Sequence, residues 1–145
     1  MWRRAILVIV AAAISYLYLW GLGYVVGLAA AQPTPLWWEA LFHTPRAAAL
    51  PWLLVSHLGA IIVLSLPFAW IVARLYGRFG VLVALGIAVA IWAMLEVPLA
   101  GDAVRSSGFL MKGLWVFDSL QLVAIFPGLV WLFRVLPSNF RWSGP

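Results

Sequence analysis

Three ionisable residues, His57, Glu96 and Asp118, stand alone inside long apolar stretches of the sequence. A charged group at the centre of a membrane-spanning helix costs about 2.5–3.5 kcal/mol on insertion scales, so each is a functional candidate by default. Gln121 follows Asp118 by three residues and shares its helix face. Tyr24 lies at a similar level of the first apolar stretch. Together these residues predict a polar layer in the outer half of a bilayer, where a histidine and two carboxylates bind a cation, relay protons or hold a small ligand.

Two other interpretations of these residues stay open. Polar side chains on neighbouring spans also form simple interhelical hydrogen bonds, which contribute about 0.6 kcal/mol each in membrane proteins. Alternatively, Glu96 and Asp118 lie at the depth of the lipid headgroups, where a charge needs no special explanation. The sequence does not decide between a functional, a structural and an interfacial polar layer.

Several kinds of chemistry are disfavoured by the residue types. The chain has no cysteine, which excludes disulfides, thiol chemistry and iron–sulfur ligation. His43 and His57 are the only histidines, and on one helix they would lie about 21 Å apart, so a single chain cannot supply a bis-histidine haem site. No local spacing motif supports a zinc site, and no hydrolase, zinc-protease or phosphate-loop motif is present. We therefore expect no cofactor and no metal, and the sequence argues against an enzyme.

The elements that must position the polar residues are apolar helices. Of the 145 residues, 66% are hydrophobic and 9% charged, against about 45–50% and about 25% in soluble domains. A stretch of about 20 apolar residues is needed to cross the hydrocarbon core as a helix. The sequence thus predicts an all-α integral membrane protein, a single membrane domain with four transmembrane helices in an up-down-up-down bundle, at 5–31, 51–73, 81–101 and 114–136.

The charges predict how these helices are oriented. Arginines cluster at one side of the predicted bundle, and the opposite side has fewer basic residues, diluted by Glu39 and Asp102. The positive-inside rule then places both termini in the cytoplasm, including a short tail at 137–145, and the short loops favour a bacterial inner membrane.

The net charge of +5 is spread over helix ends without a basic stripe, so we expect no nucleic-acid partner. Cleavage after Ala31 as a signal peptide is disfavoured, because the apolar run is too long.

The first outer loop carries helix signals and tryptophans. Thr34-Pro35 predicts a short interfacial helix at 35–43, and an irregular loop is the alternative. Thr44-Pro45 can begin the next helix early, leaving Pro51 inside it. Tryptophans prefer the headgroup zone, so Trp37, Trp38 and Trp142 are predicted interface anchors.

The first helix has a face that suits close helix packing. Gly23 and Gly27 form a G-x-x-x-G pair, which lets another helix approach. Tyr16 and Trp20, with Tyr24, recur at helical spacing beside these glycines. This face is either packed inside the bundle or docks a second copy or a larger partner.

Prolines within or near the ends of the spans are expected to shape packing; they are Pro67, Pro98 and Pro127.

Three functions agree with these observations. The first is an accessory or assembly subunit that packs against a larger membrane complex, favoured because the chain has neither a soluble domain nor a site motif. The second is an oligomeric small transporter or channel that uses the polar layer. The third is an intramembrane enzyme or a lipid- or quinone-binding protein. The partners expected are the lipid bilayer and either a larger membrane protein or further copies of the chain.

Overall fold

The computed structural model describes residues 2–42, 44–100 and 109–136, and nearly all of them are helical. The helices are α1 at Trp2–Ala31, α2 at Leu36–Glu39, α3 at Pro45–Tyr76, α4 at Gly80–Ala100 and α6 at Phe109–Val135, with a 3-10 turn, η1, at Gly77–Phe79. Within these described ranges the chain forms no strand. The all-α fold class predicted from the sequence is confirmed.

Three stretches of the described residues are long and apolar enough to cross a membrane: Ala5–Ala31, Ala48–Leu95 and Trp115–Val135. The second stretch runs through α3, η1 and α4. Large apolar side chains such as Val63, Leu82 and Met94 point outward along these helices. Such a surface needs lipid around it, so the predicted membrane location is confirmed.

Several predicted boundaries differ from the structure. The second helix begins at Pro45 and continues through Pro51 and Pro67, as the early-start alternative allowed. The predicted inner loop at 74–80 is largely helix and the turn η1. The last helix begins at Phe109, five residues before the predicted start, because apolar residues with good helix propensity precede Lys112. The short helix α2 covers only part of the predicted 35–43. Trp142 and the 137–145 tail lie outside the described residues.

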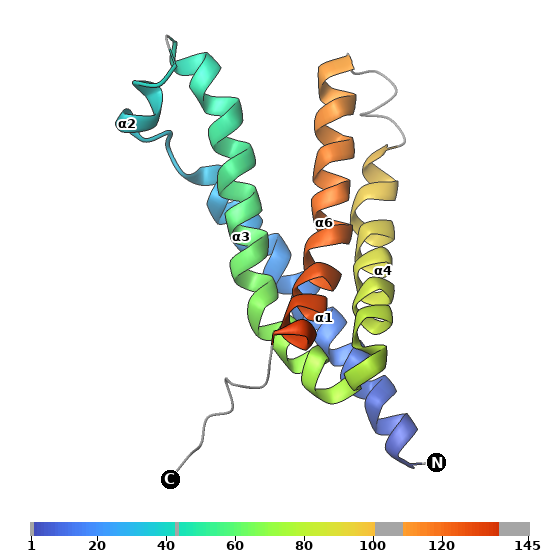
Figure 1. Ribbon diagram of the computed structural model, residues 1–145. Helices are drawn as coiled ribbons and strands as arrows, with labels where there is room; N and C mark the ends of the chain where they lie inside the picture. The colour runs from blue at the N-terminus through green and yellow to red at the C-terminus, as the bar shows by residue number, and fades with distance from the viewer. Residues whose placement is uncertain (1, 43, 101–108, 137–145) are drawn as a thin grey trace.

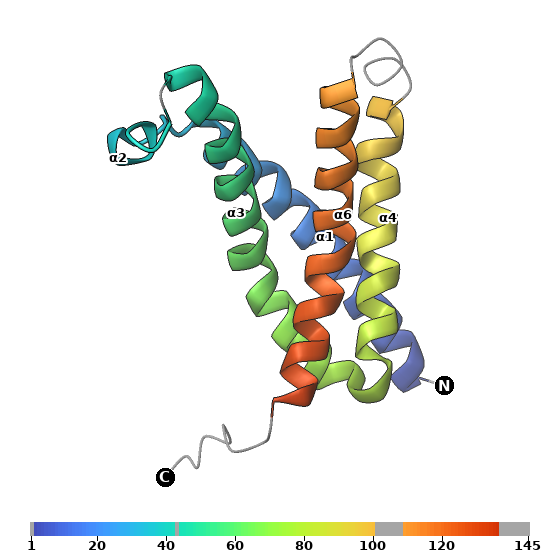
Figure 2. The ribbon, with the colours of Figure 1, turned by 45° about the horizontal axis from the view of Figure 1, so that its top comes forward.

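Figures 1 and 2 show how the long helices are arranged. α6 lies between α3 and α4, and it packs extensively against both, while α1 crosses behind and packs mainly on α3. The start of α1, the turn between α3 and α4, and the end of α6 lie at one end of the bundle. From that end α3 and α6 diverge, so their far halves stand apart in both views.

The turn between α3 and α4 depends on glycine at two positions. Gly77 has φ of +49°, a left-handed conformation that other residues adopt at a cost. A Cβ on Gly80 would lie 3.3 Å from both the Val72 carbonyl oxygen and Val130 Cγ1, so glycine lets α4 begin close against α3 and α6. Nearby, the Arg74 guanidinium lies over the Trp70 ring at 5.4 Å from the ring centroid.

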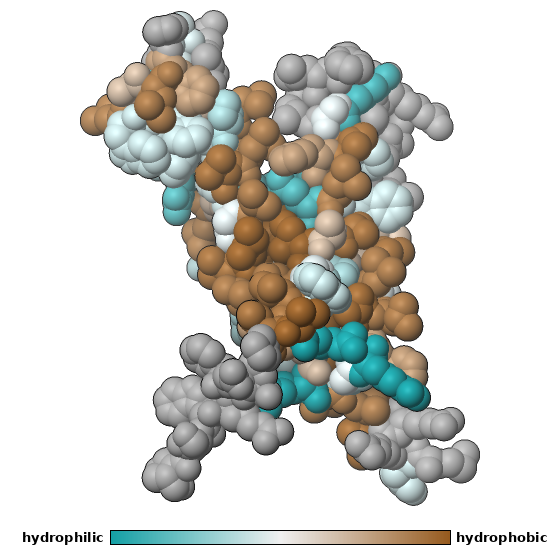
Figure 3. All heavy atoms as spheres, viewed as in Figure 1, coloured by the Kyte–Doolittle hydropathy of each residue, from teal (hydrophilic) through white to brown (hydrophobic). Residues whose placement is uncertain are grey.

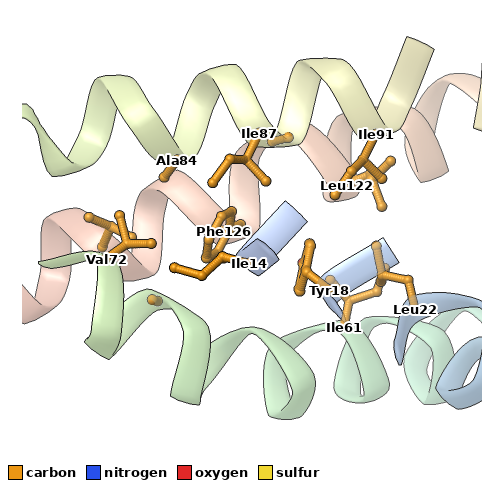
Figure 4. Packing of buried hydrophobic residues seen from close by; sticks show 13 residues of the cluster. Ile14, Tyr18, Leu22, Ile61, Val72, Ala84, Ile87, Ile91, Leu122 and Phe126 are labelled. Atoms are coloured by element: carbon orange, nitrogen blue, oxygen red, sulfur yellow. The ribbon is translucent and has the colours of Figure 1, made fainter. Parts of the chain in front are cut away.

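The core lies where α1, α3, α4 and α6 meet (Figure 4), and its centre joins α1, α3 and α6. The fully buried rings of Tyr18 and Phe126 stack at 4.8 Å between centroids, and Phe68 meets Tyr18 edge-on at 5.4 Å. The Tyr18 hydroxyl is hydrogen-bonded to Ser65 Oγ at 2.6 Å, and both residues are completely buried. One side chain of α1 therefore joins the other two helices by ring packing and by a satisfied buried polar pair.

Removing the ring of Phe126 is expected to destabilise the bundle more than removing the hydroxyl of Tyr18. Phe126→Ala leaves a cavity beside Tyr18, for a loss of about 3–5 kcal/mol. Tyr18→Phe removes one interhelical hydrogen bond, for a loss of about 1 kcal/mol. Equilibrium unfolding in mixed micelles measures both values. Equal losses would contradict this order and would mean that the Tyr18–Ser65 bond contributes as much as the stacked rings do.

Candidate functional site

The structure brings His57 and Asp118 into contact. His57 lies on α3 and Asp118 on α6, and His57 Nδ1 is 2.8 Å from Asp118 Oδ1. The side chains are 19% and 32% exposed, so the pair is neither fully buried nor free in solvent. Both residues lie in the halves of α3 and α6 that are farther from the α3–α4 turn, and Figure 3 shows hydrophilic atoms between these helices within an apolar surface. We call the region between α3 and α6 around this pair the α3–α6 seam.

The depth of the pair follows from helix geometry. At 1.5 Å per residue, His57 is about 25 Å along α3 from Arg74, and Asp118 is about 24 Å along α6 from Arg134. Arginines at helix ends mark an interface, and the hydrocarbon core is about 30 Å thick. The two distances agree, so His57 and Asp118 lie at the same level of the bundle, towards the end opposite the α3–α4 turn.

Gln121 lies one turn deeper than Asp118 and is only 7% exposed. Its amide nitrogen and oxygen are both buried, and neither has a hydrogen-bond partner in the part of the chain that the structure describes. An unpaired buried polar group costs about 1–3 kcal/mol. The Gln121 carboxamide is therefore a buried polar group that the described residues leave unsatisfied.

The other two residues of the predicted polar layer are placed differently. Glu96 lies in the last part of α4, and its side chain falls outside the described part of the structure. Tyr24 is 62% exposed on α1 and stacks against Trp20. Of the five predicted residues, His57 and Asp118 are in contact, Gln121 lies beside them along α6, and Tyr24 points outward. Within the described residues, no three His, Asp or Glu side chains gather where they could hold a metal ion.

The aromatic and glycine residues of α1 form an outward face. Tyr16 and Trp20 are each 70% exposed. A Cβ added to Gly23 or Gly27 would meet nothing within 4 Å, so these glycines are not used for packing inside the described bundle. We call the set Tyr16, Trp20, Gly23, Tyr24 and Gly27 the α1 outer face.

The tryptophans of the first loop hold it against α3. Trp38 Nε1 donates to the Ala48 carbonyl oxygen at 3.0 Å. Trp37 and Trp38 both contact the Trp52 ring, at 6.1 Å and 5.6 Å between centroids. Trp37 is exposed, whereas Trp38 is partly buried. Trp37 and Trp38 thus join α2 to the start of α3. The sequence predicted only that these two tryptophans anchor the loop in the headgroup zone.

Sequence reasoning missed five buried polar groups, which are Ser65 Oγ, Ser119 Oγ and the indole nitrogens of Trp52, Trp92 and Trp115. Ser65, the partner of Tyr18, is an isolated hydroxyl in an apolar run and carries no local signal. The indole nitrogens of Trp92 and Trp115 are buried without a hydrogen-bond partner among the described residues. In a sequence, a tryptophan indicates only an apolar or interfacial position. The packing of the helices is needed to show that its N–H faces the interior.

These features define the chain as an all-α membrane protein with a half-buried histidine–aspartate pair between two of its helices. Comparison with models of protein families, with curated proteins and with solved structures finds no match to the chain.

The contact between His57 and Asp118 is expected to couple α3 and α6. In a double-mutant cycle with His57→Ala and Asp118→Ala, the double variant should lose about 1 kcal/mol less stability than the two single losses added together. Asp118→Asn should lose less than Asp118→Ala, because its Oδ1 can still accept from the imidazole. Unfolding in mixed micelles gives the four free energies. Strictly additive losses would show that the two side chains do not interact in the membrane.

Proposed function

We propose that α1, α3, α4 and α6 each cross the bilayer in an up-down-up-down four-helix bundle, with α2 on the outer surface. The 48-residue apolar stretch Ala48–Leu95 would be about 72 Å long as a single helix, more than twice the hydrocarbon core. Its turn at η1 supports two crossings instead of one. The basic residues near this turn support a cytoplasmic location for it, and hence for both termini.

This topology predicts the behaviour of reporters fused after Pro145. A fluorescent protein that folds only in the cytoplasm should be bright there, and an alkaline phosphatase that is active only outside should be inactive. The same reporters inserted after Gln32 should give the opposite result, because one crossing separates the two positions. An active phosphatase at the C-terminus would contradict the proposed topology.

We further propose that the chain is an accessory or assembly subunit that binds a larger membrane protein through the α1 outer face. The observation that carries this proposal is the depth of Tyr16 and Trp20. Tyr18, between them, bonds Ser65, which is about 14 Å along α3 from Arg74. That is half of the hydrocarbon thickness, so the exposed side chains of Tyr16 and Trp20 lie near the middle of the bilayer.

Lipid tails are a poor environment for these two side chains. Tyrosine and tryptophan favour the headgroup zone, where the O–H and N–H meet water. At the middle of the bilayer, neither Tyr16 nor Trp20 has a hydrogen-bond partner among the described residues. A polar group left unpaired in hydrocarbon is costly. A partner helix would remove that cost and could pack closely over Gly23 and Gly27.

A different protein suits this face better than a second copy. Two copies inserted the same way would meet at equal depths, so Trp20 would meet Trp20 and one indole donor would face another. A helix of another protein can instead present a hydroxyl or carbonyl acceptor at that level. An oligomeric transporter remains the alternative. Its path would have to run between copies, because Tyr18, Phe126 and their neighbours fill the interior of the described bundle.

Native mass spectrometry after gentle extraction from the source membrane tests the subunit proposal. The wild-type chain should be recovered bound to a larger membrane protein. The double variant Tyr16→Leu/Trp20→Leu should insert and fold but retain less than about a tenth of that partner, since it loses two buried hydrogen bonds. Trp131→Leu, which changes an exposed tryptophan of α6, is the matched control and should retain the partner.

Two outcomes would count against this proposal. Recovery of the wild-type chain only as a homo-oligomer would favour the transporter alternative. Full partner binding by the double variant would show that the α1 outer face is not the docking surface.

A further inference from the structure

Basic side chains gather at the end of the bundle that holds the α3–α4 turn. Arg74 near the end of α3, Arg78 in η1 and Arg134 near the end of α6 are all exposed. The glycine turn brings α3, α4 and α6 into contact there, so neighbouring segments carry the three arginines. Figure 3 shows hydrophilic atoms at this end, directly next to the apolar surface. We call the surface formed by Arg74, Arg78 and Arg134 the basic end.

The start of α1 adds to the positive charge of the basic end. The hydroxyl of Tyr76, which lies beside the turn, donates to the Leu7 carbonyl oxygen of α1. Arg3 and Arg4 precede Leu7 by about one helical turn. The backbone of α1 therefore places two more arginines at the same end of the bundle.

The chain supplies no counter-charge at the basic end. Within the described part of the chain, no carboxylate forms an ion pair with any of its three arginines. Asp118 lies about 24 Å along α6 from Arg134, and Glu96 lies about 24 Å along α4 from the turn. Glu39 belongs to α2, and Asp102 follows α4 in the sequence. An anion from outside the chain can thus approach these arginines without displacing a carboxylate.

Exposed apolar side chains border the arginines of the basic end. The Arg78 guanidinium lies over the Phe79 ring at 4.7 Å from the ring centroid, as Arg74 lies over Trp70. Stacking on a ring occupies one face of a guanidinium and leaves its in-plane N–H groups able to donate. Trp70 and Trp131 lie one turn before the arginines of α3 and α6, and each is more than half exposed. Hydrogen-bond donors and apolar surface thus lie next to each other.

This combination fits an anionic phospholipid better than a soluble anion. Guanidinium groups bind phosphate oxygens through paired N–H donors, and the bordering aromatic rings offer a surface to acyl chains. A soluble phosphate would use the guanidinium groups alone. A zwitterionic phospholipid brings its own ammonium group, which the surrounding arginines repel, so a net negative headgroup is favoured.

We propose that the basic end binds the phosphate of an anionic phospholipid, whose acyl chains lie along α3 and α6 beside Trp70 and Trp131. Such a lipid would bridge α3, the turn and α6 at the end of the bundle where these segments meet. The proposal rests on the proposed crossings of α3, α4 and α6, which bring this end to the membrane surface. It depends neither on which face is cytoplasmic nor on docking through the α1 outer face.

The proposal is tested with the full chain in neutral detergent micelles. Phosphatidylglycerol and phosphatidylcholine are titrated separately, and native mass spectrometry gives the dissociation constant of the first bound lipid. The wild-type chain should bind phosphatidylglycerol at least about fivefold more tightly than phosphatidylcholine. Arg74→Gln/Arg134→Gln should weaken phosphatidylglycerol binding at least about fivefold, because two phosphate-binding charges are lost.

The matched control is Arg46→Gln/Lys112→Gln, which removes two positive charges near the starts of α3 and α6 and should bind as the wild type does. A second measurement keeps the test decisive if the arginine variant fails to fold. Phosphatidylglycerol should raise the thermal unfolding midpoint of the wild-type chain in a saturable manner, and phosphatidylcholine should not.

Three results would overturn the proposal. They are equal binding of the two lipids by the wild-type chain, undiminished phosphatidylglycerol binding by Arg74→Gln/Arg134→Gln, and equal weakening in both double variants, which would show a general effect of net charge. Because micelles contain no bilayer, such a failure concerns the lipid site alone. A failure of the proposed crossings would appear instead in the reporter fusions.

Discussion

The rest of the structure depends on the meeting of Tyr18, Phe126 and Ser65 in the middle of the bundle. Lipid tails are as apolar as the side chains, so burial from water does not hold spanning helices together, and packing and interhelical hydrogen bonds must do so. Tyr18 supplies both, because its ring stacks on Phe126 and its hydroxyl bonds Ser65. This single side chain of α1 joins α3 and α6 in the middle of the bundle, and α4 follows the tight turn at Gly77 and Gly80 and packs against α6.

Fixing the helices at that level leaves the far halves of α3 and α6 free to diverge. If they packed closely along their whole length, His57 and Asp118 would be fully buried, where an ionisable pair is hard to sustain. The divergence gives the pair partial exposure while the core below stays dry and closed. The same geometry turns Tyr16 and Trp20 outward, since the buried side of α1 is already occupied by Ile14, Tyr18 and Leu22. One packing arrangement thus produces both the polar seam and the α1 outer face.

The all-α membrane character could be read from the sequence because it follows from composition and run length, which are local properties. The residues of the α3–α6 seam were also identifiable, since a lone His or Asp in an apolar run is conspicuous. Their pairing was not, because it depends on the rotation of α3 against α6. Ser65 was missed for the same reason: one hydroxyl in an apolar run has meaning only when Tyr18 is placed against it. The start of α6 at Phe109 was missed because Lys112 and Gly113 resemble a loop, although helix propensity tolerates both.

The α1 outer face and the α3–α6 seam differ in how far their polar groups can be reached. Tyr16 and Trp20 are exposed on the surface of the bundle, so a helix of another protein, as proposed, can offer them hydrogen-bond acceptors without any change in the bundle. Gln121 is enclosed by the chain itself, and its amide atoms have almost no accessible surface. His57 and Asp118 lie between these extremes, since both are partly exposed. The same packing around Tyr18 thus leaves polar side chains in three settings, and of these the α1 outer face is the one most open to a second protein.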